Sequence, residues 1–101
     1  MNFNSIECVL VQSRYMNNDN LALILKDKYN MGGAPIAVVT VNTDEKLPAD
    51  QAYVKDYSEN TGMMKSLEEA GLIKEILREK QSGFVTLTLV KFNLDGIKII
   101  K

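Results

Sequence analysis

The stretch Phe84-Val85-Thr86-Leu87-Thr88-Leu89-Val90-Lys91-Phe92 decides the fold class of this 101-residue chain. Its residues alternate with a period of two and include several β-branched and aromatic side chains, which is typical of a β-strand with two distinct faces. Ser82 and Gly83 precede the stretch as a turn signal. An Asp-Gly step within residues 93–96 predicts a turn into a closing strand over residues 97–100.

A helix is predicted upstream of this strand from apolar residues at helical spacing: Met63, Met64, Leu67 and Ala70. Asn60 is a good N-cap, because its side chain can accept a hydrogen bond from a backbone N–H of the first turn. Gly71 fits the C′ position, with Leu72 at C″ packing on Leu67 as in a Schellman ending. Residues 72–80 fit a kinked continuation, a second short helix or an irregular connection, and these alternatives stay open.

Four strands are predicted in the first half of the chain: Ile6–Arg14, Leu21–Lys26, Ile36–Asn42 and Ala52–Tyr57. The Asn- and Asp-rich residues 16–20 predict a turn, so the first two strands form a hairpin. The third strand follows Pro35 and is nearly continuously apolar, as a strand covered on both faces would be. The fourth strand is short and carries charges, which suits the edge of a sheet.

These elements follow the order ββββ-α(α)-ββ and predict an α+β fold. We expect an antiparallel sheet of about five or six strands, with one or two short helices packed on one face. The length suits a single domain over residues 1–101 that buries one core without disulfides or metals.

The composition argues against several classes of protein. With a formal net charge of -1 and no basic run, the chain has no general attraction to nucleic acid or to an anionic membrane. The polar start of the chain does not fit a signal peptide, and no apolar stretch approaches the roughly 20 residues of a membrane helix. Cys8, the single cysteine, lies in an apolar stretch and is expected to be buried and inert. A cytoplasmic location follows as the default.

The residues point to no catalytic site, no metal site and no cofactor. The chain has no histidine, which removes Ser-His-Asp and Cys-His devices and the commonest metal ligand. The adjacent carboxylates Asp44-Glu45 and Glu68-Glu69 are expected to be solvated surface residues. Gly32-Gly33 fits a turn better than a phosphate-binding loop.

The tyrosines give the candidate binding surface. Tyr53, Lys55 and Tyr57 share one side of a predicted strand, while Ala52 and Val54 share the other. We expect the first three to form an exposed patch with the adjoining loop through Asn60, because tyrosine is enriched at interfaces. The alternative is that Tyr53 packs under the helix with its hydroxyl at the rim.

The motif order resembles a family of small proteins encoded by bacterial mobile elements, known as domain of unknown function 4313. The resemblance is carried by residues 15–23 (YMNNDNLAL), 39–42 (VTVN), 52–56 (AYVKD) through Asn60, 67–72 (LEEAGL) and 82–84 (SGF). It implies a mobile-element setting and no established activity, and it transfers no catalytic residue.

Two functional hypotheses follow. The first is a non-catalytic protein-interaction module, such as a mobile-element accessory or anti-defence protein that binds a host protein. The second is a nucleic-acid-binding module in which Tyr53 and Tyr57 stack on bases and Lys55 meets phosphate. The near-neutral charge weighs against the second hypothesis.

Overall fold

The computed structural model describes residues 1–95 and 97–99. Over these residues it has nine strands, one 3₁₀ helix and one α-helix: β1 Asn2–Phe3, β2 Ile6–Arg14, β3 Leu21–Asp27, β4 Ala37–Val38, β5 Thr40–Val41, β6 Gln51–Val54, η1 Ser58–Asn60, α1 Met63–Glu69, β7 Ile73–Ser82, β8 Val85–Phe92 and β9 Lys98–Ile99. The predicted α+β class is confirmed. None of the helices in this part of the chain is long and apolar enough to span a membrane.

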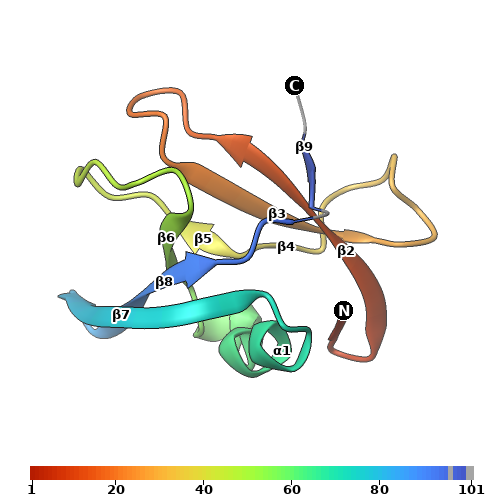
Figure 1. Cartoon of the computed structure of the whole chain (residues 1–101). Coiled ribbons are helices and arrows are strands. Elements are labelled where there is room, and N and C mark those ends of the chain that lie inside the picture. Colours follow the sequence, from red (N-terminus) through yellow and green to blue (C-terminus); the bar gives the residue numbers. More distant parts are fainter. Residues whose placement is uncertain (96, 100–101) are drawn as a thin grey trace.

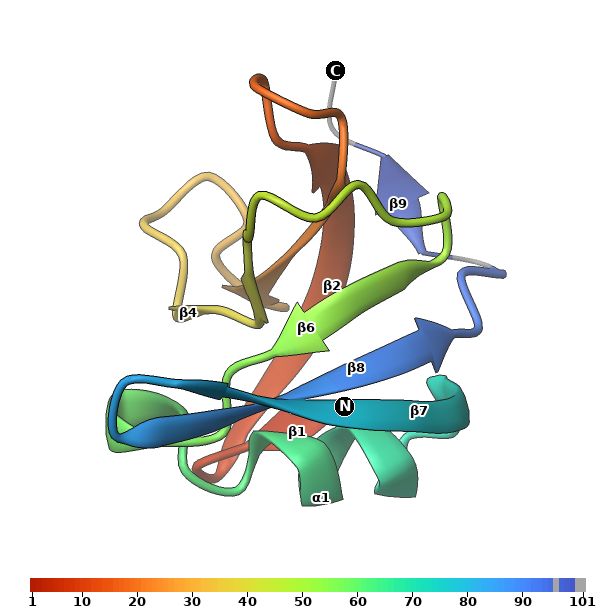
Figure 2. The same cartoon turned by 90° about the vertical axis from the view of Figure 1, so that its left-hand side faces the viewer.

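The strands form two sheets rather than the single sheet expected (Figure 1). The first sheet has the order β1-β2-β3-β4, with β9 also paired to β2. The second has the order β5-β6-β8-β7. Figure 2 shows β6 and β8 of the second sheet crossing in front of β2, with α1 below both. The core therefore lies between the two sheets and the helix.

The expected continuous strand over residues 36–42 divides at Val39 because its backbone serves both sheets. The Val39 N–H donates to the Leu23 carbonyl of β3 at 2.9 Å. The Val39 carbonyl accepts a hydrogen bond from the Lys55 N–H, just after β6, at 2.9 Å. Val39 is fully buried at this crossing. The expectation that the run is covered on both faces was wrong, because Val38 is 45% exposed, and its two halves, β4 and β5, belong to different sheets.

The first hairpin is confirmed. β2 and β3 pair antiparallel from Cys8 opposite Asp27 to Arg14 opposite Leu21. The Tyr15 N–H donates to the Asn20 carbonyl at 2.9 Å to close the loop. Within this loop Asp19 has a φ of 61°, a left-handed conformation that Asp adopts more readily than most residues.

The helix ends as predicted but begins differently. The Gly71 N–H donates to the Glu68 carbonyl, and the Leu72 N–H donates to the Leu67 carbonyl, which is the Schellman pattern. At the other end the N-cap is Gly62, with a φ of 92°, and not Asn60.

The side chain that caps the helix comes from further upstream. Asp56 Oδ1 accepts hydrogen bonds from the Gly62 and Met63 N–H groups at 2.7 and 3.0 Å. The predicted cap, Asn60, lies in η1 with its side chain directed to the body of the protein. The turn η1 lies between Asp56 and the helix, and the Asp56 side chain reaches past it to the first N–H groups of the helix.

Residues 73–82 form a strand, β7, and not a second helix. The pairing of β7 with β8 shifts register between Ile73 and Glu75 and again between Ile76 and Arg78. The first shift inserts an extra residue between Ile73 and Ile76, so these two lie opposite Phe92 and Val90 on one face despite their helical spacing. The bulges thus produced a pattern that sequence reasoning could read as a helix.

The end of the chain does not fold back on β8 as a hairpin. Instead β9 pairs parallel with β2, with Val11 opposite Lys98. Leu94 and Ile97 are partly buried against the core, so this segment crosses the core to reach the other sheet. Gly96 and Ile100 of the predicted turn and strand lie outside the described residues.

Two groups of apolar side chains form the interior. The larger lies between the sheets and includes Leu23, Leu25, Val54, Met63 and Leu67. The smaller lies on the other side of the second sheet and comprises Leu47, Tyr53, Leu87 and Leu89. Cys8 belongs to the larger group, and burial raises the pKa of its thiol. Its burial is confirmed, and its inertness stays a prediction.

Leu67→Ala is expected to destabilise the protein by about 2–5 kcal/mol, because a fully buried leucine is removed from the centre of the core. Urea denaturation measures the loss, with Glu68→Ala on the exposed side of the same helix as the control. A loss for Leu67→Ala of no more than about 0.5 kcal/mol, the range of ordinary surface changes, would contradict the placement of α1 over the core.

Candidate binding surface

The predicted patch of Tyr53, Lys55 and Tyr57 does not form, because Tyr53 is buried. Its side chain is 1% exposed and packs with Leu47, Leu87 and Leu89. Ala52 and Val54 do face the larger core, as expected. The expectation that Tyr53 points to solvent was wrong because the outer face of the second sheet is also covered. Its cover includes Leu47, from the loop that precedes β6.

A polar group closes over the buried tyrosine ring. The Tyr53 hydroxyl donates to Glu45 Oε1 at 2.9 Å and accepts a hydrogen bond from Arg78 Nη2 at 3.3 Å. Arg78 also forms a salt bridge with Glu45. Lys80 Nζ lies 5.7 Å from the centroid of the Tyr53 ring, within cation–π distance. The bonds from Arg78 and Tyr53 lower the pKa of the Glu45 carboxyl. Glu45 therefore fastens its loop to β6 and β7, and it is not simply a solvated carboxylate.

The other three predicted residues lie just after β6. Lys55 forms a salt bridge with Glu59, and its Nζ lies 5.4 Å from the centroid of the Tyr57 ring. The pKa of the Glu59 carboxyl is lowered to about 2, chiefly by the hydrogen bond from Lys55. Lys55 and Tyr57 are both half-buried. These two residues lie side by side, but their main contacts are with each other and with Glu59.

Asn60 is a structural residue. It is 1% exposed, and its Nδ2 donates to the Val38 carbonyl at 2.7 Å. Among the residues that the structure describes, its Oδ1 has no hydrogen-bond partner. The bond to Val38 ties η1 to β4, so Asn60 holds the turn against the first sheet and presents no surface to a ligand.

Two stretches that carry the family resemblance meet in space. The Tyr15 hydroxyl contacts Thr40 Oγ1 at 3.0 Å. Asn20 Nδ2 donates to Asn42 Oδ1 at 3.2 Å and to the Glu45 carbonyl at 2.7 Å. These bonds fasten the first hairpin loop to the segment after β5. These two stretches therefore help to join the sheets.

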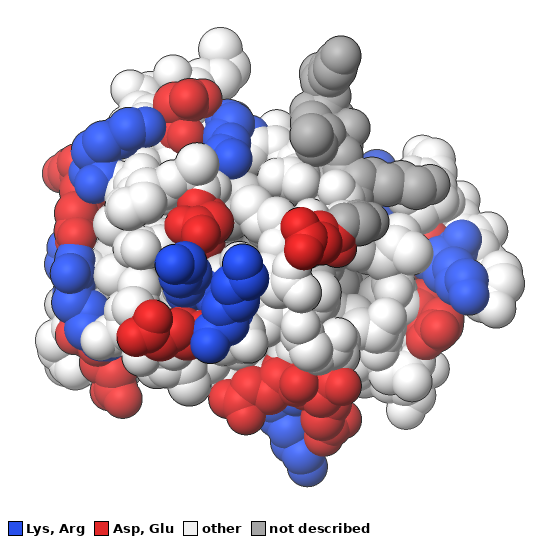
Figure 3. All heavy atoms as spheres, in the orientation of Figure 1, with Lys and Arg blue, Asp and Glu red and all other residues white. Residues whose placement is uncertain are grey.

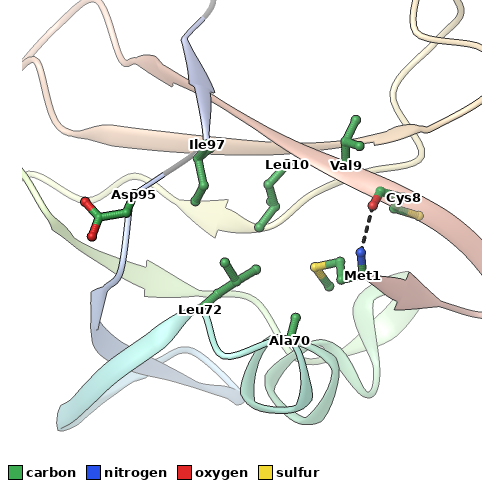
Figure 4. Close-up of a pocket in the computed structure, with 8 residues that line it drawn as sticks. All are labelled: Met1, Cys8, Val9, Leu10, Ala70, Leu72, Asp95 and Ile97. Atoms are coloured by element: carbon green, nitrogen blue, oxygen red, sulfur yellow. Dashed lines mark hydrogen bonds between the residues drawn. The ribbon is translucent and has the colours of Figure 1, made fainter.

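A pocket of about 270 Å³ lies between β2, the end of α1 and the segment after β8. Its lining is mainly apolar and comprises Met1, Cys8, Val9, Leu10, Ala70, Leu72, Asp95 and Ile97 (Figure 4). In Figure 4, Leu10 and Ile97 extend downward toward Leu72, and Ala70 lies below. The concavity is formed by residues from four separate parts of the chain.

The polar groups at the pocket lie at its margin. The Met1 ammonium donates to the Cys8 carbonyl at 2.9 Å, which fixes that side of the wall. Asp95 is exposed and supplies a carboxylate. Glu69 lines an adjoining hollow that shares Met1 and Ala70 with the pocket. An apolar group could therefore enter while charged groups outside it keep their water.

The turn between β7 and β8 presents a second unusual feature. Phe84 is fully exposed, at 105% of its reference area. It follows Gly83, whose φ of 62° makes the tight turn. In Figure 1 this turn is the far left end of the hairpin, well away from α1 and β9. A phenyl group without cover at a projecting tip is a candidate contact residue.

Charges over the face seen in Figure 3 are mixed. Blue and red side chains alternate over its left side, and red side chains lie above and below a white central area. This face therefore has no continuous basic area for a phosphate backbone. Within the described residues, no group of three or more side chains gathers that could hold a metal ion.

Sequence reasoning missed the pocket and the exposed tip. No pattern links Met1, Leu72 and Asp95, because only the folded chain brings them together. Phe84 had a local signal in the preceding Ser-Gly turn, which places the next residue at a hairpin tip. It was read as the first residue of the strand, whereas β8 begins at Val85.

Comparison with protein families gives one match. The model of a family described as a domain of unknown function, DUF4313, matches residues 8–100. The chain belongs to this family. No curated protein and no solved structure matches the chain significantly. The match to DUF4313 covers the helix and both sheets apart from β1 and the first residues of β2, but the family description assigns no activity.

Tyr53→Ala is expected to cost about 3–5 kcal/mol, as for other large buried aromatic residues. Tyr53→Phe keeps the packing and leaves Glu45 paired with Arg78, so it should cost only about 1 kcal/mol. Urea denaturation of the two variants, with Tyr57→Ala for comparison, measures the difference. Equal small losses for Tyr53→Ala and Tyr57→Ala would mean that Tyr53 is not a core residue.

The bonds of the Glu45 carboxylate to Arg78 and Tyr53 predict that the stability of the protein depends on pH. Because its pKa is lowered in the folded state, the stabilisation is present above the unfolded pKa and is lost as pH falls through the folded value. The melting temperature of the wild type should exceed that of Glu45→Gln near pH 7, and this gap should close below about pH 4. Glu68→Gln, on the exposed helix face, is the control. A gap independent of pH would contradict the role of the ionised carboxylate.

Proposed function

We propose that this DUF4313 protein is a non-catalytic protein-interaction module whose pocket receives an apolar side chain of a partner protein. Its setting would be the cytoplasm, as an accessory or anti-defence protein of a mobile element that binds a host protein. The pocket supports the interaction role. The mobile-element setting rests on the family resemblance alone.

The observation that carries the proposal is the size and lining of the pocket. Small-molecule sites commonly have volumes of roughly 300–1,000 Å³, with several polar groups that orient the ligand. This pocket is about 270 Å³, and apolar side chains such as Leu10, Leu72 and Ile97 dominate its wall. That combination suits one large apolar side chain better than a cofactor. Anchoring side chains in such pockets contribute much of the energy of protein interfaces.

The chemistry of the pocket favours binding over catalysis. Its thiol, Cys8, is buried, has a raised pKa and donates to the Ile6 carbonyl at 3.2 Å. A protonated thiol is a poor nucleophile, because the thiolate is the reactive form. Asp95 is exposed at the margin, where its carboxylate is solvated.

The nucleic-acid alternative loses its main support. It required Tyr53 and Tyr57 to stack on bases from one exposed face. Tyr53 is in the core and Lys55 is paired with Glu59, so of these two tyrosines only Tyr57 keeps surface for stacking. Protein binding is therefore the function that we propose.

Affinity capture from the natural host with a pocket-filling variant tests this proposal. Ala70 is exposed, lines the pocket and has a φ of -83°, so Ala70→Phe should fill the pocket without straining the backbone. Ala34→Phe, at another exposed alanine, is the matched control. We expect a protein partner to be retained by the wild type and by Ala34→Phe, and to be lost by Ala70→Phe.

Thermal melting of all three proteins shows whether Ala70→Phe is folded. Retention of every partner by a folded Ala70→Phe protein would remove the pocket from consideration. Capture that disappears on nuclease treatment would favour the nucleic-acid alternative.

A further inference from the structure

We propose that Phe84 of one molecule inserts into the pocket of a second copy, so that the protein self-associates weakly, head to tail. The inference rests on the proposed role of the pocket as a receptor for an apolar side chain. It joins two features that are otherwise unexplained, an apolar concavity and a fully exposed phenyl group.

The position of Phe84 makes the contact intermolecular. Phe84 precedes the eight residues of β8, which at about 3.3 Å per residue separate the hairpin tip from the pocket end by roughly 26 Å. The longest dimension of the molecule is 34 Å. Phe84 therefore lies toward the opposite end of the molecule from Leu72 and Asp95, and it cannot fill the pocket of its own chain.

The exposure of Phe84 and the size of the pocket permit the contact. Phe84 projects from a tight turn with nothing packed against it, so it can enter a concave surface without rearrangement of its neighbours. The pocket, at about 270 Å³, has room for a phenyl group, since an apolar cavity of about 150 Å³ already accommodates benzene. Its apolar wall of Leu10, Leu72 and Ile97 would replace water around the ring, and the removal of apolar surface from water favours binding.

The charges permit the approach. Residues 81–86 at the tip contain no charged side chain, so docking of the tip requires no desolvation of a charged group there. Lys80 is the charged residue closest to the tip along β7, whereas the pocket margin carries Asp95 and the adjoining hollow carries Glu69. The Met1 ammonium at the same pocket is positive but is bound to the Cys8 carbonyl, and the two carboxylates outnumber it, so Lys80 meets no net like charge.

The size of the contact limits its strength. A single aromatic side chain buries about 150–250 Å², while stable interfaces bury about 1,200–2,000 Å² in total. We therefore expect dissociation constants near the millimolar range. Because the two contact surfaces differ, each dimer keeps one free tip and one free pocket and can extend further. A tighter-binding partner protein would displace the tip from the pocket.

Sedimentation equilibrium of the full chain from micromolar to millimolar concentration tests the inference. The average mass of the wild type should rise with concentration. Phe84→Ser and Ala70→Phe should each weaken the association roughly tenfold or more, because the buried phenyl or the space for it is lost. Met16→Ser removes another fully exposed apolar side chain from a different hairpin loop, and it should leave the association unchanged.

Mixing the two weakened variants gives the decisive observation. Phe84→Ser keeps its pocket and Ala70→Phe keeps its tip, so an equimolar mixture should form dimers that do not extend. If Ala70→Phe proves unfolded, Ala70→Leu provides a smaller block. Chemical-shift changes at Leu72 and Ile97 on addition of unlabelled wild type then report on the pocket directly.

Several outcomes would overturn the inference. These are a wild type that stays monomeric at millimolar concentration, an association that survives Phe84→Ser, or a mixture that behaves as the sum of its parts. None of these results bears on the proposed function, since Phe84→Ser leaves the pocket open for a partner protein. If Ala70→Phe loses partner capture and Phe84→Ser retains it, the pocket binds a partner protein whether or not the chain self-associates.

Discussion

The backbone of Val39 forms hydrogen bonds to both sheets, and the rest of the structure depends on this crossing. Its N–H bonds to β3 and its carbonyl bonds to the residue after β6, so one extended segment is an edge for each sheet. A backbone group left unpaired in this buried position would be costly. Thr40 reinforces the crossing, because its Oγ1 accepts a hydrogen bond from the Leu23 N–H and contacts the Tyr15 hydroxyl.

The joining of the sheets accounts for the other features of the fold. With the sheets joined along residues 37–41, apolar side chains from both meet in one core that α1 closes from below. The loop after β5 is held by Asn20 and by Glu45, and so it covers the outer face of the second sheet. Tyr53 is buried by that cover. The pocket lies where β2, the end of α1 and the segment after β8 come together.

The proposed function rests on which surfaces this arrangement buries and which it leaves exposed to solvent. The face of the second sheet that carries Tyr53 is covered by the loop with Leu47 and Glu45. The first hairpin loop is fastened to the segment after β5 by amide hydrogen bonds. An apolar pocket and a projecting aromatic tip remain as places where another protein could gain energy by excluding water. The bulges and charges of β7, by contrast, make its long edge a poor site for the addition of a strand.

Elements that depend on local interactions could be predicted from the amino-acid sequence. The alternation over residues 84–92, the first hairpin with its Asn-rich loop and the Schellman ending at Gly71 were all predicted, because each depends on residues close together in the chain. Contacts between distant parts of the chain produce the split at Val39, the parallel pairing of β9 with β2 and the bulged strand in place of a helix over residues 73–82. They also decide the candidate site. Alternation placed Tyr53 on the face opposite Ala52, but whether that face met water depended on Leu47 and Glu45 from a loop that no periodicity describes.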